Sequence, residues 1–116
     1  MKLIIAGGRA YFLTKQDYAY LDALNKATPI TEVVCGGATG VDDCGNVWAR
    51  GKKIPVRLFI PEWRRYGHAA GPVRNTLMAK YADAVVLFPG GSGTKSMRKE
   101  AIAAGITIYE PHHAQP

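Results

Sequence analysis

The fold is indicated most clearly by the stretch AVVLFPGGSGTKS, residues 84–96, in which a cluster of glycines follows an apolar run. Five consecutive apolar residues, without alternation, indicate a strand that is covered on both faces, as in a parallel sheet. Glycines that directly follow such a strand and precede a helix let backbone amides approach an anion. The stretch therefore predicts a buried parallel strand, then an anion-binding loop, then a helix.

Comparable apolar runs recur along the chain at intervals of about 25 residues. The five predicted strands are residues 3–6, 32–35, 56–60, 84–88 and 106–109. Helical patterns lie between them: Thr14 and Asp17 form a predicted capping box, and Gly105 is placed to end the last helix. Strands that alternate with helices predict an α/β domain, in the form of a Rossmann-like, doubly wound parallel five-stranded sheet.

Apolar stripes predict the helix faces that pack on the sheet. The stripes are Val41, Cys44, Val47 and Trp48 in the second helix, Val73, Leu77 and Tyr81 in the third, which has Pro72 at its first position, and Met97, Ala101 and Ala104 in the fourth. Asn75 lies about 200° around the third helix from Val73, at about 100° per residue. We therefore expect Asn75 to face a ligand rather than the core.

The first, second and fourth predicted strands are each followed by a glycine cluster. Ligands of open α/β sheets bind beyond the carboxyl ends of the strands, at the point where the strand order reverses. The order 3-2-1-4-5 makes the three glycine-bearing strands neighbours, whereas the order 2-1-3-4-5 would place strand 3 between them. We therefore predict the order 3-2-1-4-5, with a binding crevice between strands 1 and 4.

Length and composition restrict the class of protein. With 116 residues, the chain is expected to form one domain over residues 1–110, followed by a frayed tail at 111–116. Its apolar runs are too short to cross a bilayer and its first residues lack the apolar region of a secretory signal, so we predict a cytoplasmic protein without a membrane partner. Cys35 and Cys44 form no CxxC or Cys/His cluster, which predicts free thiols and no metal site.

The charge is unevenly distributed. Residues 1–49 carry four basic and five acidic side chains, whereas residues 50–116 carry eleven and four, so the whole positive excess behind the net charge of +6 lies in residues 50–116. This imbalance suggests an anionic partner, either a phosphorylated small molecule or a nucleic acid, or else a solvated basic face. The predicted loop EWRRYGH, residues 62–68, interleaves aromatic residues with arginines, and it either stacks a base or covers the sheet edge with Trp63 packed on the domain.

Four motifs together carry a resemblance to a known family. Neither the dinucleotide pattern GxGxxG nor the P-loop pattern GxxxxGK[ST] occurs. Instead, GGR at 7–9, GGATGVD at 36–42, GPVRN at 71–75 and PGGSGT at 89–94 are similar, in order and spacing, to the motifs of the SLOG superfamily, in particular its YspA-like, YpsA-related branch. The superfamily also includes the LOG phosphoribohydrolases and the DNA-processing protein A group. The resemblance implies a Rossmann-like fold that binds nucleotides or nucleotide-derived ligands.

The expected ligand-binding residues come from these loops. Arg9 can hold a phosphate bidentately or form a surface salt bridge, and Asp42 can accept from ribose hydroxyls or simply stabilise the first turn of its helix. Ser92 and Thr94 can hydrogen-bond a phosphate, and one of them is expected to cap the helix. The full set is Gly7, Gly8, Arg9, Gly36, Gly37, Ala38, Gly40, Asp42, Arg74, Asn75, Pro89, Gly90, Gly91, Ser92, Gly93 and Thr94.

One departure from the family pattern bears on catalysis. LOG enzymes extend the last motif to PGGxGTxxE, and the position of their catalytic glutamate is occupied here by Met97. A thioether cannot act as an acid or a base, and Met97 also belongs to a predicted apolar stripe. No catalytic residue can be assigned, and we predict that LOG-type hydrolysis is absent.

The sequence therefore predicts a sensor or sequestering module for a nucleotide or nucleotide-derived ligand, for example an ADP-ribose-like or cyclic nucleotide signal, with no cofactor. One alternative is a nucleotide-cleaving, phosphoribohydrolase-like enzyme. A second is a single-stranded nucleic-acid binder. Because oligomers are frequent in the superfamily, the resemblance also suggests a homodimer.

Overall fold

The computed structural model describes residues 1–112 and forms one five-stranded sheet. Its strands are β1 (Lys2–Ala6), β2 (Glu32–Cys35), β3 (Val56–Leu58), β4 (Ala84–Leu87) and β5 (Thr107–Tyr109). All pairs are parallel and the order is β3-β2-β1-β4-β5, so the predicted topology is confirmed. Residues 113–116 of the predicted tail lie outside the described residues.

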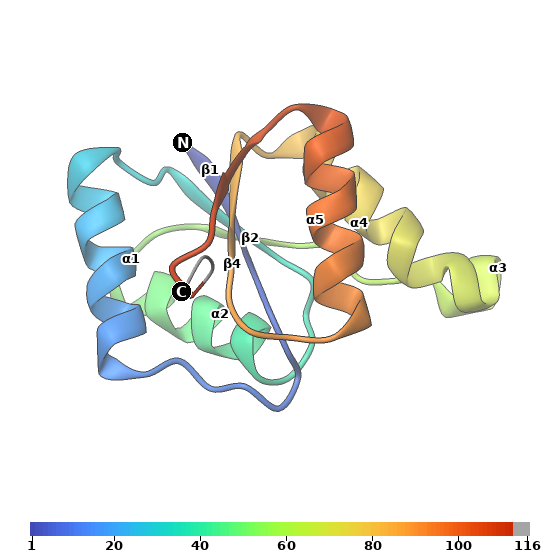
Figure 1. Cartoon of the computed structure of the whole chain (residues 1–116), viewed down its shortest axis with the longest axis horizontal. Coiled ribbons are helices and arrows are strands. Elements are labelled where there is room, and N and C mark those ends of the chain that lie inside the picture. Colours follow the sequence, from blue (N-terminus) through green and yellow to red (C-terminus); the bar gives the residue numbers. More distant parts are fainter. Residues whose placement is uncertain (113–116) are drawn as a thin grey trace.

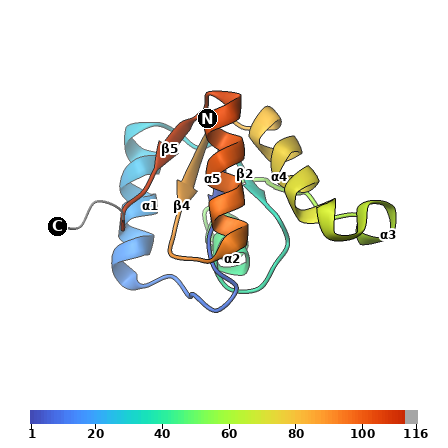
Figure 2. The same cartoon turned by 45° about the vertical axis from the view of Figure 1, so that its right-hand side comes forward.

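Helices cover both faces of the sheet (Figures 1 and 2). They are α1 (Lys15–Ala27), α2 (Val41–Gly51), α3 (Trp63–Tyr66), the 3₁₀ helix η1 (Gly67–Ala69), α4 (Ala70–Tyr81) and α5 (Ser92–Ala104). Within residues 1–112, none of the helices is both long enough and apolar enough to cross a membrane.

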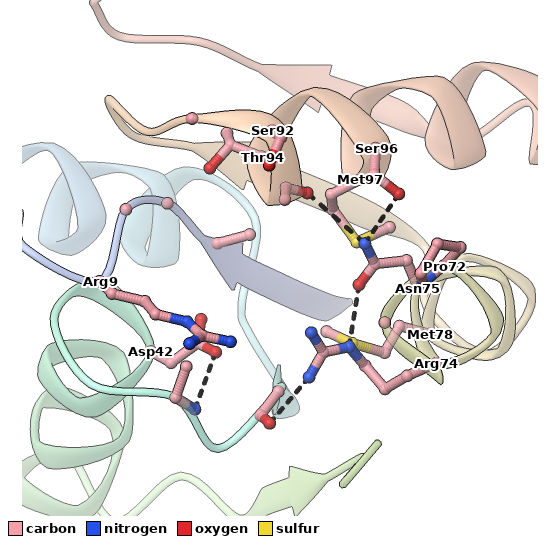
Figure 3. A pocket seen from close by; sticks show the side chains of 18 of the residues that line it. Arg9, Asp42, Pro72, Arg74, Asn75, Met78, Ser92, Thr94, Ser96 and Met97 are labelled. Carbon is pink, nitrogen blue, oxygen red and sulfur yellow. Dashed lines mark hydrogen bonds between the residues drawn. The ribbon is translucent and has the colours of Figure 1, made fainter. Parts of the chain in front are cut away.

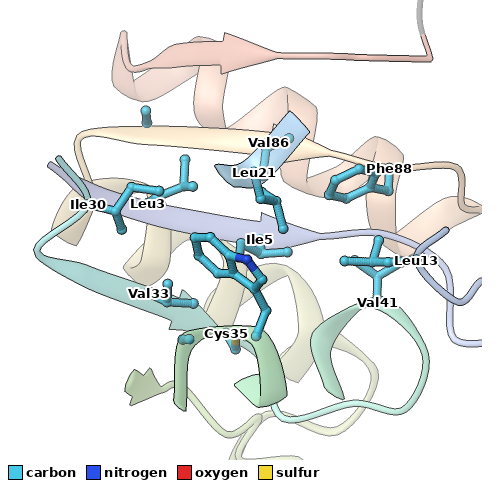
Figure 4. Packing of buried hydrophobic residues seen from close by; sticks show 13 residues of the cluster. Leu3, Ile5, Leu13, Leu21, Ile30, Val33, Cys35, Val41, Val86 and Phe88 are labelled. Atoms are coloured by element: carbon cyan, nitrogen blue, oxygen red, sulfur yellow. The ribbon is translucent and has the colours of Figure 1, made fainter. Parts of the chain in front are cut away.

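Alternation along the central strands divides the core into two layers. Leu3 and Ile5 of β1 pack with Leu21 of α1 and the apolar side of α2, and Figure 4 shows this cluster. Ile4 of β1 packs in the other layer, with Met78 of α4 and residues of α5. Because β1 contributes to both layers, every residue of its apolar run is buried, as expected for a strand inside a parallel sheet.

The predicted capping box begins α1. Thr14 Oγ1 accepts a hydrogen bond from the Asp17 amide, and Asp17 accepts one from the Thr14 amide at 3.0 Å. Tyr11 also donates to Asp17 at 2.5 Å, and His112 Nε2 lies 2.7 Å from its other carboxylate oxygen. Burial alone would raise the pKa of Asp17, but these hydrogen bonds hold it below its ordinary value. The last described residue is therefore bound to the start of α1.

The predicted stripes of three helices are partly wrong, and in α5 the exposed member is Ala104. Val47 of α2 is exposed, and Leu77 of α4 is 51% exposed, although both were expected in the core. In α4 the buried residues are instead Ala70, Asn75, Met78 and Ala79. The reason is that α4 packs against α5 as well as against the sheet, so its buried face is set by two neighbours and includes a polar residue.

Close packing of α2 on the sheet depends on Gly45. A Cβ at this position would lie 2.9 Å from Ile5 Cγ2, whereas a Cβ on Gly51, in the same helix, would meet nothing within 4 Å. We expect Gly45→Ala to lower the free energy of unfolding by about 1–3 kcal/mol through overpacking. Gly51→Ala should be neutral or stabilising by up to about 1 kcal/mol. Urea unfolding measures both, and equal effects would contradict this packing.

Candidate functional site

A pocket of about 560 Å³ lies beyond the carboxyl ends of β1, β2 and β4, where the strand order reverses. Most of the predicted binding residues line it, from all four motifs. These are Gly7, Gly8, Arg9, Gly36, Ala38, Asp42, Arg74, Asn75, Gly91, Ser92, Gly93 and Thr94. The other predicted residues, Gly37, Gly40, Pro89 and Gly90, are not part of its lining.

The glycine loops hold one another by backbone contacts. The Gly8 amide donates to the Pro89 carbonyl at 2.8 Å, and a Cβ on Gly8 would lie 3.0 Å from that oxygen. Gly40 has φ +71°, and a Cβ there would collide with the carbonyl oxygens of Gly8 and Arg9. A Cβ on Gly90 would lie 2.7 Å from the Gly8 amide nitrogen. Gly40, Pro89 and Gly90 therefore join the loops to one another.

Two further glycines leave open space at the start of α5. A Cβ on Gly91 or Gly93 would meet no atom within 4 Å, and both residues line the pocket. No side chain caps the amino terminus of α5, so the prediction that Ser92 or Thr94 caps the helix is wrong. The first-turn amides of an uncapped helix remain available to a ligand, and the Ser92 and Thr94 side chains lie beside them (Figure 3).

Arg74 and Asn75 connect β2 to α5 across the pocket (Figure 3). Arg74 Nη1 donates to the Gly36 carbonyl at 2.8 Å, and its Nε donates to Asn75 Oδ1 at 2.9 Å. Asn75 is only 5% exposed, and its Nδ2 donates to Ser96 Oγ at 3.2 Å. Burial lowers the pKa of the Arg74 guanidinium. Both side chains thus line the pocket as predicted, but they also form hydrogen bonds within the protein.

Asp42 is the buried carboxylate of the pocket. It is 9% exposed, and its Oδ2 accepts a hydrogen bond from the Ala38 amide at 3.1 Å. Burial raises its pKa, and the Ala38 hydrogen bond and the Arg74 charge oppose this rise only in part. A Cβ on Gly36 would contact both Asp42 and the Arg74 guanidinium, so the absence of a side chain there lets the two groups share one end of the pocket.

Arg9 supplies a second positive charge to the pocket, and this charge acts on Asp42 through space. Its guanidinium lines the pocket near Asp42 (Figure 3). Among residues 1–112 no group forms a hydrogen bond or salt bridge with this guanidinium, in contrast to that of Arg74. The salt bridge considered from the sequence is therefore absent from the described part of the chain.

Several residues that line the pocket were not among the predicted binding residues. The segment 62–68 was expected to be a loop but forms α3 and η1, and Trp63 and His68 from it line the pocket. Trp63 is 53% exposed, so of the two alternatives for this segment the one in which Trp63 packs on the domain is wrong. Ser96 follows Ser92 by one helical turn, a spacing that could have identified it. Met97 is buried as predicted, and with Met78 it also forms part of the pocket lining.

Comparisons with known proteins agree with this geometry. The model of the YspA, cpYpsA-related SLOG family matches residues 1–66. The Gene 61 protein of Mycobacterium phage D29 is 35% identical over 98 residues, which cover 78% of each chain. The X-ray structure of DNA processing protein A (DprA) from Streptococcus pneumoniae is similar in fold, with a TM-score of 0.70 and 17% identity. That match covers 94% of this chain but 49% of DprA, so this chain spans about half the DprA length.

The bridging role of Arg74 can be tested by mutation. Arg74→Met removes the hydrogen bonds to Gly36 and Asn75 and leaves Arg9 as the remaining cation near Asp42. Because hydrogen bonds to charged groups contribute about 1.5–3 kcal/mol, we expect a loss of about 2–3 kcal/mol in the free energy of unfolding. Arg64→Met, at an exposed arginine, should change it by less than about 0.5 kcal/mol. Similar urea midpoints for the two variants would show that the bridge is dispensable.

Proposed function

The chain belongs to the YspA, cpYpsA-related SLOG family, and on that premise we propose that its pocket binds a nucleotide or nucleotide-derived ligand, as a sensor or sequestering module. One observation carries the proposal. The uncapped amino terminus of α5 opens onto the pocket beside two glycines whose Cβ positions are free, Gly91 and Gly93. The binding domain comprises residues 1–110, and cytoplasmic localisation and a homodimer stay predictions.

A phosphate group is the ligand feature that this end of the pocket suits. The amino terminus of a 13-residue helix carries a partial positive charge, and its free amides donate to anionic oxygens. Arg9 adds an unpaired guanidinium, which can hold a phosphate by two parallel hydrogen bonds. The hydroxyl groups of Ser92 and Thr94 provide further donors. Together these groups favour a phosphate over a neutral group.

Asp42 is suited to the sugar of such a ligand. A carboxylate oxygen accepts hydrogen bonds from hydroxyl groups, and this one is held in place by the Ala38 amide. A pocket of about 560 Å³ falls within the usual range of about 300–1,000 Å³ for small-molecule sites. A sugar phosphate with Asp42 at its hydroxyls and α5 at its phosphate thus uses both polar ends of the site.

Hydrolysis of the ligand is not part of the proposal, although one observation keeps an enzymatic function as the alternative. Burial raises the pKa of Asp42, and shifted carboxyl groups in pockets are typical of catalytic sites. However, Met97 occupies the position of the LOG glutamate, and Asp42 is the only carboxyl group that lines the pocket within residues 1–112. Glu100 instead accepts a hydrogen bond from Thr76 at 2.9 Å.

Single-stranded nucleic acid is a weaker candidate, because most basic side chains of residues 50–74 already have partners. Of the lysines and arginines in this segment, only Lys53 and Arg64 lack a hydrogen bond, ion pair or ring contact within the described residues 1–112. The partnered ones are Arg50 with Asn46, Lys52 with Asp22, Arg57 with Tyr81, Arg65 with Glu62 and Arg74 with Gly36. The positive excess of this segment therefore supports a local anion site better than a long phosphate track.

Gly93→Val tests the phosphate site. The valine side chain would occupy the open space beside the first turn of α5, so we expect the affinity for AMP and for inorganic phosphate to fall about 10-fold or more, since each lost hydrogen bond to a charged group costs about 1.5–3 kcal/mol. Gly51→Val is the matched control, a helical glycine with equally open space outside the pocket. Isothermal titration calorimetry measures both. Unchanged affinity in a folded Gly93→Val protein would reject the site.

Incubation with nucleoside monophosphates separates binding from turnover. We expect no free base above the uncatalysed background, because Met97 and Met78 offer no acid or base and Asp42 acts alone. Chromatography of the reaction mixture gives the measurement. Base release that disappears in Asp42→Asn but persists in Glu100→Gln would establish the enzymatic alternative.

A further inference from the structure

Trp63 is an exposed aromatic residue that the fold does not use. It opens α3, a helix without any buried residue, which Figure 1 shows at the end of the molecule away from α1. The other tryptophan, Trp48, is buried, and its Nε1 donates to Asp22 at 3.0 Å. Among residues 1–112 no aromatic ring or cation stacks on the Trp63 indole, whereas Arg65 of the same helix lies over Tyr66 at 5.0 Å. Core packing thus gives no reason for an indole at position 63.

The indole nevertheless belongs to the pocket. Trp63, His68 and Pro72 line it together with the glycine loops. Gly67 directly follows α3 and is the first residue of η1, with φ +55° and ψ −129°, a conformation that only glycine adopts readily. This glycine lets the chain turn sharply between Trp63 and His68, and both side chains reach the same pocket. The local sequence therefore places an aromatic side chain on the same pocket as the proposed phosphate site.

We infer that the ligand carries an aromatic base that stacks on Trp63, which makes this residue a specificity determinant for nucleotides over sugar phosphates. The inference rests on the proposed function, since the phosphate and sugar lie at α5 and Asp42. Stacking of a base on an aromatic side chain strengthens binding about 5- to 150-fold and tolerates different bases, because every base has a π face. The pocket thus selects for the presence of a base more than for its identity.

Fluorescence and affinity together test the stacking. In a Trp48→Phe background all tryptophan emission comes from Trp63, because the chain contains two tryptophans. We expect the 5′-nucleoside monophosphates AMP, GMP, CMP and UMP to quench this emission saturably. Ribose 5-phosphate should bind without quenching it.

Variants at position 63 then measure the contribution of the indole. Trp63→Ala should weaken binding of the four nucleotides about 5- to 150-fold and leave the affinity for ribose 5-phosphate unchanged. Trp63→Phe, which keeps an aromatic face, should retain most of the affinity. Gly67→Ala should act like Trp63→Ala, because it displaces α3 without removing the indole. Phe12→Ala removes an exposed aromatic residue outside the pocket and should affect neither ligand.

The outcomes distinguish this inference from the proposed function. Equal affinity of the wild type for nucleotides and ribose 5-phosphate, or an equal loss of both in Trp63→Ala, would overturn the base-stacking role while the phosphate site remains. Full affinity for both probes in Gly93→Val would instead reject the phosphate site. If the wild type bound neither probe at millimolar concentration, both proposals would be wrong.

Discussion

Direct contact between the backbones of glycine loops is the constraint on which the rest of the pocket depends. The Gly8 amide bonds to the Pro89 carbonyl, and neither Gly40 nor Gly90 has room for a Cβ because the loop after β1 lies against both. Any side chain at these positions would separate the loops that follow β1, β2 and β4. Because the loops touch, the amino termini of α2 and α5 lie close together. Asp42 and the first turn of α5 therefore face a common cavity.

The topology could be predicted from the sequence because the strand order is associated with a local sequence feature, the glycine clusters. Glycine clusters follow β1, β2 and β4, the three central strands of the sheet. Their positions along the chain therefore indicate that these strands are neighbours. The buried face of α4 is not associated with any such local sequence feature. Asn75 is buried because Arg74 and Ser96 satisfy its amide, and these partners come from its own first turns and from a different helix. An apolar periodicity cannot represent a polar residue whose burial depends on distant partners, and it therefore placed Leu77 wrongly inside.

The location of the site could be predicted from the sequence, but the separate roles of its individual residues could not. Gly90 and Gly91 are adjacent and look equivalent in the sequence, yet a Cβ on Gly90 would strike the loop after β1 and a Cβ on Gly91 would meet open space. One glycine thus serves the packing of loops and the other leaves room beside a helix terminus. This distinction arises only when the two loops are brought together, so three-dimensional structure is required to see it. For the same reason the sequence left two alternatives open for Trp63, base stacking or packing on the domain, because its neighbours in the pocket come from other motifs.

The positions of the charged side chains in the folded protein indicate more about the partner than the net charge does. The positive excess behind the net charge of +6 lies after residue 49, which from the sequence alone is compatible with a nucleic-acid surface. Folding pairs many of these side chains with acids, amides or rings, and leaves Arg9, from the acidic half of the chain, as the unpaired cation of the pocket. With Arg74 and Asp42, the pocket holds two cations and one buried carboxylate. This local balance fits one compact anionic ligand with hydroxyl groups, and it follows from which loops the glycines bring together rather than from the overall composition.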